Sequence, residues 1–145
     1  MRRLITLMSI FLISQPIIPQ SSLPENFFIS PVDIEIYLSG SFAELRQGHF
    51  HSGIDIKTQG ITGKNIRAIA DGYVSRIKVQ TNGYGKSVYI NHPGGYTSVY
   101  GHLQDYKDPI DEYVKRYQYK NRIHTLDIYP AKNELRVKKG QIIAS

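Results

Sequence analysis

Short apolar runs joined by glycine-rich turns constrain the fold of this chain more than any other feature. The clearest turns are Asp71-Gly72, Asn82-Gly83-Tyr84-Gly85 and the Pro-Gly-Gly of residues 93–95. Strands of this length and spacing, joined in this way, are typical of antiparallel sheets, sandwiches and barrels. The sequence therefore predicts a mainly β fold with an antiparallel sheet or a barrel-like core. The expected strands are residues 66–70, 73–79, 87–90, 96–100 and 142–144.

After residue 105 the pattern changes from strand to helix. Asp108 is a capping type of residue, and Pro109 suits the first helical position. The apolar residues that follow are spaced to share one helical face. We expect a helix that ends near Tyr119, within a helical insertion of about residues 105–135 that lies on the sheet.

The first 22 residues have the plan of a secretory signal. Met1-Arg2-Arg3 is basic, and residues 4–13 form an apolar run that is too short to span a bilayer comfortably. No clear cleavage site follows, so an uncleaved N-terminal anchor is the alternative. We expect a signal peptide over residues 1–22 and one domain over residues 23–145, in the cell envelope, periplasmic or secreted, with no stable membrane span after cleavage.

Composition excludes several kinds of site. The chain has no cysteine, so any metal must be held by His, Asp or Glu. Its net charge of +6 falls to +4 without Arg2 and Arg3, which suits an anionic surface such as a cell wall. Basic residues do not form a run interleaved with aromatics, so nucleic acid is not an expected partner. An ordinary solvated basic surface explains the charge equally well.

Residues 48–57 carry the strongest chemical signal. Read as one strand, they place Phe50 and Ile54 on a face that can enter a core, and His51 and Asp55 together on the other face. Imidazole nitrogen and carboxylate oxygen form a donor pair that zinc accepts. The alternative is a half-buried strand whose wet face carries ordinary polar groups.

The run Arg46-Gln47-Gly48-His49-Phe50-His51-Ser52-Gly53-Ile54-Asp55 resembles the first zinc motif, His-x-x-x-Asp, of the lysostaphin/LytM-like zinc metallopeptidases, peptidase family M23. It is most similar to the form found in bacterial envelope members. The resemblance implies a zinc cofactor and makes His51 and Asp55 two of its three protein ligands.

A second segment, Asn91 to Leu103, resembles the same family's Gly-Gly-Tyr…Tyr-(Ala/Gly)-His-Leu pattern. The resemblance implies that His102 is a catalytic histidine that acts on the attacking water or stabilises the oxyanion, and not a zinc ligand. His92 and His124 are interpreted as surface groups. His49 is either solvated, a substitute ligand or a residue that supports the ligands.

The family's third ligand belongs to a second His-x-His, on a strand that follows a segment like Val137–Ala144, and this sequence has no His-x-His apart from His49-Phe50-His51 of the first motif. We therefore expect a domain that is incomplete at the C-terminus: either a fragment of a zinc metalloendopeptidase that cleaves peptidoglycan peptides, or a degenerate module that binds wall peptides or regulates a partner hydrolase. A scaffold without any ligand is a third hypothesis. The substrate-binding residues and the oligomeric state are left open, and we expect the 145 residues alone to be inactive on peptidoglycan.

Overall fold

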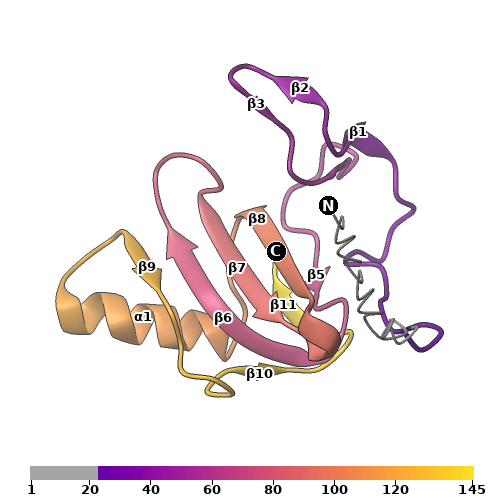
Figure 1. Ribbon diagram of the computed structural model, residues 1–145. Helices are drawn as coiled ribbons and strands as arrows, with labels where there is room; N and C mark the ends of the chain where they lie inside the picture. Colours follow the sequence, from indigo (N-terminus) through magenta and orange to yellow (C-terminus); the bar gives the residue numbers. More distant parts are fainter. Residues whose placement is uncertain (1–22) are drawn as a thin grey trace, which may run out of the picture.

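The computed structural model describes residues 23–145, so the expected leader over residues 1–22 lies outside the described part. At the centre is a five-stranded antiparallel sheet (Figure 1). β6 (Gly72–Val79) pairs with β7 (Lys86–Asn91), which pairs with β8 (Thr97–Leu103). β9 (Leu126–Ile128) and β10 (Arg136–Val137) share the other edge of β6. The predicted mainly β, antiparallel fold is confirmed.

Three short antiparallel pairs surround this sheet. β5 (Ile66–Arg67) pairs with β11 (Ile142–Ala144), which brings the last residues of the sequence back to the middle of the chain. β1 (Leu38–Gly40) pairs with β4 (Asp55–Ile56), and β2 (Leu45–Arg46) pairs with β3 (His49–Phe50). The β2–β3 hairpin extends away from the main sheet (Figure 1).

The predicted helix is α1 (Ile110–Asn121), and it packs on the sheet through its apolar face. Ile110 and Val114 are 1% and 4% exposed and belong to the same cluster as the buried strand residues Val88 and Ile90. The expected cap at Asp108 is wrong: Pro109 is the N-cap, and no side chain caps the helix. Within residues 23–145, no helix is long and apolar enough to cross a membrane.

A β-bulge in β6 changes which side chains reach the core. A regular strand would place Tyr73, Ile77 and Val79 on one face. The register shifts between Val74 and Arg76, and both Val74 and Ile77 are fully buried. One extra residue in β6 explains this change. It reverses the alternation of faces, so that side chains before the bulge and side chains after it no longer follow one regular pattern.

Residues 48–57 do not form one strand, which corrects the prediction. They contribute to β3 and β4, which belong to different pairs and are separated by a loop at residues 51–54. Phe50 and Ile54 were expected to enter a core, yet they are 67% and 52% exposed. Gly53, without a side chain to pack, lies where the strand is interrupted.

Candidate metal centre

The loop between β3 and β4 brings His51 and Asp55 together. His51 Nε2 lies 3.3 Å from Asp55 Oδ1, and His51 Nδ1 lies 3.0 Å from the carbonyl oxygen of Ser41. A carbonyl can only accept, so Nδ1 carries the hydrogen and donates to it. In the neutral ring the Nε2 lone pair then faces a carboxylate oxygen, and these two acceptors need a cation or a proton between them.

The donor pair fits zinc on geometric grounds. Zinc–nitrogen and zinc–oxygen bonds of about 2.0–2.1 Å at a tetrahedral angle separate two ligand atoms by roughly 3.3 Å. The spacing between His51 Nε2 and Asp55 Oδ1 matches that separation. The hydrogen bond to Ser41 also fixes the ring orientation, as metal-binding histidines commonly require.

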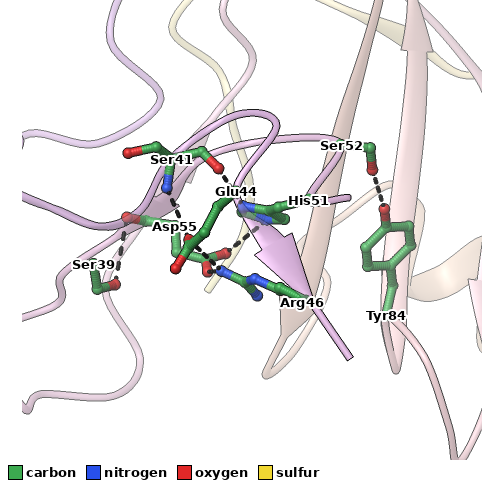
Figure 2. Close-up of polar contacts among 8 residues, drawn as sticks. All are labelled: Ser39, Ser41, Glu44, Arg46, His51, Ser52, Asp55 and Tyr84. Atoms are coloured by element: carbon green, nitrogen blue, oxygen red, sulfur yellow. Dashed lines mark hydrogen bonds and ion pairs between the residues drawn. The ribbon is translucent and has the colours of Figure 1, made fainter. Parts of the chain in front are cut away.

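Arg46 holds the other oxygen of Asp55. Its guanidinium donates to Asp55 Oδ2 and also lies 3.4 Å from Glu44 Oε2, as Figure 2 shows. Gly40 makes room for this pair, because a Cβ at position 40 would collide with both Arg46 and Asp55. The hydrogen bond from Arg46 lowers the pKa of Asp55, and the positive charge of Arg46 lowers it further. Asp55 is therefore ionised at neutral pH, as a metal ligand must be.

His102 lies at the end of β8, near this carboxylate. The β7–β8 register shifts between Lys86 and Val88, and His102 has a left-handed φ of 56° in the resulting bulge. Bulges of this kind redirect a side chain out of the regular ladder. The His102 ring is exposed and meets the Tyr84 ring edge-on, with centroids 5.9 Å apart.

Tyr84 connects the loop to the sheet. Its hydroxyl lies 3.0 Å from Ser52 Oγ, next to His51 in the sequence (Figure 2). Its ring packs closely over Gly101, where a Cβ would lie only 3.1 Å from the ring. Tyr84 thus contacts both the loop that carries His51 and the His102 ring at the end of β8.

The remaining histidines take no part in this cluster. His49 Nδ1 lies 3.3 Å from the Gln47 carbonyl, and within residues 23–145 it has no ion pair with Asp55. His124 is exposed, as expected. The interpretation of His92 as a surface group is wrong: it is 6% exposed, and its nitrogens contact the Asp71 carbonyl at 2.8 Å and Ser98 Oγ at 2.7 Å.

The described residues contain no group of three or more His, Cys, Asp or Glu side chains placed to hold one metal ion. The cluster therefore offers two ligands and a nearby histidine. Sequence reasoning missed the contributions of Arg46, Glu44 and Tyr84. Arg46 lies within the quoted motif, so an arginine beside two expected metal ligands was a signal for a residue that supports the carboxylate.

Comparison with known protein families identifies one family that matches the region of the His51–Asp55 cluster. The model of peptidase family M23 matches residues 49–119, a range that includes His51, Asp55, Tyr84 and His102. No curated protein and no solved structure matches the chain. The family match agrees with the resemblance of both motifs, and over residues 49–119 the chain belongs to peptidase family M23.

Proposed function

We propose that this protein contributes to a zinc metalloendopeptidase that hydrolyses peptide bonds in peptidoglycan. His51 and Asp55 would hold the zinc ion, and His102 would act on the reacting water. The observation that carries this proposal is the 3.3 Å approach of two acceptor atoms, His51 Nε2 and Asp55 Oδ1. The membership of residues 49–119 in a peptidase family supports it.

The chain's own residues prepare this site before any ligand arrives. The hydrogen bond to the Ser41 carbonyl orients the His51 ring so that Nε2 faces Asp55. Arg46 lowers the pKa of Asp55 and binds its Oδ2, which leaves Oδ1 free to bind a cation. His102, exposed beside Tyr84, would accept a proton from a water molecule or donate one to a leaving group. Held by His51 and Asp55, a zinc ion would supply Lewis acidity that lowers the pKa of water toward neutrality and polarises a carbonyl.

The ligand count bears on how the site works. Catalytic zinc usually takes three protein ligands, whereas the described residues bring together two. Residues 1–22, which lie outside the described part of the chain, contain no His, Asp, Glu or Cys. A three-ligand site would therefore need one donor in addition to His51 and Asp55.

Peptidoglycan peptides are the proposed substrate, and the cell envelope is the proposed location. The basic run and apolar stretch of residues 1–13 have the plan of a secretory signal, and the net charge of +6 suits an anionic wall. The β2–β3 hairpin beside the proposed ligands exposes Phe42, Leu45 and Phe50, by 71%, 74% and 67%. These apolar side chains would give a peptide substrate a surface to contact.

The two-ligand cluster also favours a second candidate function. A degenerate module of the same family would bind wall peptides, or regulate a partner hydrolase, without cleaving a bond. Assay of the complete gene product on purified peptidoglycan separates the two. Zinc-dependent release of muropeptides supports the peptidase, and retention on peptidoglycan without release supports the module.

Zinc binding by the 145-residue chain is tested by calorimetry. We expect weak binding in the wild type and loss of measurable binding in the His51→Ala, Asp55→Ala double variant. His124→Ala is the matched control, because it removes an exposed histidine distant from the cluster. Equal affinity in the wild type and the double variant would refute the metal centre.

A further inference from the structure

A cavity of about 510 Å³ lies at the opposite end of the main sheet from His51 and Asp55. It is formed by the start of β6, the end of β7, the start of β8 and the segment around β10. In Figure 1 this end of the sheet lies at the bottom, near β10, and the β2–β3 hairpin lies at the top. Its size is within the range of small-molecule sites, which is about 300–1,000 Å³.

Four residues in register form one continuous row across the floor of this cavity. Arg136 of β10 is opposite Tyr73 of β6, Tyr73 is opposite Asn91 of β7, and Asn91 is opposite Thr97 of β8. Directly opposed residues of antiparallel strands place their side chains on the same face. All four line the cavity, so the register of four strands builds one polar surface.

Hydrogen bonds fix the centre of this row. Asn91 Nδ2 donates to the Tyr73 hydroxyl at 3.2 Å, and the Thr97 hydroxyl donates to Asn91 Oδ1 at 2.9 Å. Ser75 Oγ also donates to Asn91 Oδ1 at 3.0 Å. The Tyr73 hydroxyl accepts from Asn91 and keeps its own hydrogen for another acceptor. The row is thus held in place and can still donate to a ligand.

Most charged residues that line the cavity are cationic. Lys132, Arg136 and Lys138 line it, with Asp71 as the one acidic lining residue. Asp71 Oδ1 accepts a hydrogen bond from the Lys139 backbone N–H at 2.8 Å, and Oδ2 lies 3.7 Å from Lys138 Nζ. In the described part of the chain, Lys132 and Arg136 form no ion pair. Two cations thus face the cavity with no carboxylate bound to them there.

An aromatic ring completes the lining. Tyr96 is 38% exposed and packs against Phe28 with the ring centroids 5.5 Å apart, which holds it at the rim. His92, buried beneath, is held by the Asp71 carbonyl and Ser98. A part-exposed tyrosine provides an apolar surface next to the polar row, as in sites that bind a flat ligand with a polar edge.

We propose that this cavity binds an acidic saccharide, a sugar unit that carries a carboxylate. Arg136 and Lys132 bind the carboxylate, the Tyr73–Asn91–Thr97 row bonds to sugar hydroxyls, and Tyr96 contacts the sugar ring. The cavity is much larger than a lone inorganic anion needs, and its neutral hydroxyl and amide groups suit a hydroxylated ligand. The site is separate from the His51–Asp55 cluster and does not depend on the proposed peptidase activity.

The test uses the ¹⁵N-labelled 145-residue chain and a tetrasaccharide of alternating N-acetylglucosamine and glucuronic acid. We expect saturable amide shifts at Tyr73, Asn91, Thr97 and Arg136. The Lys132→Gln, Arg136→Gln double variant should lose affinity by about a hundredfold or more, because it removes both charge-assisted bonds to the carboxylate. Lys132→Gln alone should weaken binding in the same direction and keeps the test valid if the double variant misfolds.

Two control ligands and one control variant test whether binding requires the carboxylate, the sugar and the cavity cations. The neutral tetrasaccharide of N-acetylglucosamine should bind far more weakly, and inorganic phosphate should not reach the affinity of the acidic tetrasaccharide. Lys120→Gln, which removes one positive charge from the last turn of α1, should leave affinity within about twofold. Absence of saturable shifts at the four residues would overturn the proposal. Equal binding of the neutral sugar or of phosphate, or an equal loss in Lys120→Gln, would also overturn it.

Discussion

The carboxylate of Asp55 is contacted from two sides, and this explains the chemistry of the loop. Arg46 binds one oxygen, and His51 Nε2 lies 3.3 Å from the other. The arginine lowers the pKa of the carboxylate, and the hydrogen bond from His51 Nδ1 to Ser41 leaves Nε2 of the neutral ring as an acceptor. Two acceptors at this distance form a site that favours a bound cation.

Removing the guanidinium should raise the pKa of Asp55. In Arg46→Gln the largest cause of the lowered pKa, the hydrogen bond from Arg46, is lost together with its charge. The Asp55 side-chain ¹³C signal, followed against pH in the metal-free protein, measures this change. Lys57→Gln removes a positive charge from the same segment and should leave the titration unchanged. An unaltered Asp55 titration in Arg46→Gln, or an equal shift in Lys57→Gln, would contradict the role of Arg46.

At this scale the sequence predicted which residues meet but not how. The four-residue spacing and the family resemblance brought His51 and Asp55 together, and the structure does so as well. The expected means was one regular strand, whereas the structure uses a loop between β3 and β4. Sequence periodicity cannot reveal this loop, because it depends on contacts between distant positions. Asp55 contacts Arg46, 9 positions earlier in the chain, and Gly40, 15 positions earlier.

Among the secondary-structure elements, α1 contributes to stability through its buried face. Ile110 is 1% exposed, whereas Ile123, just beyond the helix, is 38% exposed. We expect Ile110→Ala to lower the free energy of unfolding by about 2–4 kcal/mol, through lost burial and a residual cavity. Ile123→Ala is the matched control and should cost clearly less. Urea denaturation measures both, and equal losses would show that α1 does not pack as described.

The contact between β6 and β9 predicts a dependence of stability on pH. Arg76 Nε and Nη2 donate to the two oxygens of Asp127 at 2.7 and 2.6 Å, and this pair lowers the pKa of Asp127 below its ordinary 3.8. A lowered carboxyl pKa stabilises the folded state above the ordinary value, and this contribution is lost as pH falls through the folded-state pKa. Wild type should therefore lose more stability below about pH 4 than Asp127→Asn does.

Thermal unfolding at a series of pH values measures that difference. Glu25→Gln, which removes an exposed carboxylate near the start of the described chain, serves as the control and should follow the wild-type curve. If Asp127→Asn also follows the wild-type curve below about pH 4, the Arg76–Asp127 pair does not contribute to stability.

The elements themselves were largely predictable, but their partners were not. Apolar alternation and glycine turns predicted the strands that became β6, β7, β8 and β11. The bulge in β6 was not predictable, because it depends on pairing with β7 and places Val74 and Ile77 together in the core. β9 and β10 were not among the expected strands, because they form by pairing with the open edge of β6.

For the whole molecule, the main sheet separates two regions of different chemistry. One end carries His102 and Tyr84 beside the His51–Asp55 loop. The other carries the polar row and the cations Lys132 and Arg136. Pairing of β5 with β11 was not readable from the sequence, because it joins residues more than 70 positions apart and depends on tertiary contacts.

Long-range ¹H–¹⁵N spectra of the histidine rings show most directly whether His51 Nε2 and Asp55 form a metal centre. On addition of zinc, we expect the Nε2 signal of His51 to shift while its Nδ1 stays protonated and bonded to Ser41. Asp55→Asn should weaken this response, and His124→Ala should not. A His51 ring unchanged by zinc, or a response confined to other histidines, would contradict the claim.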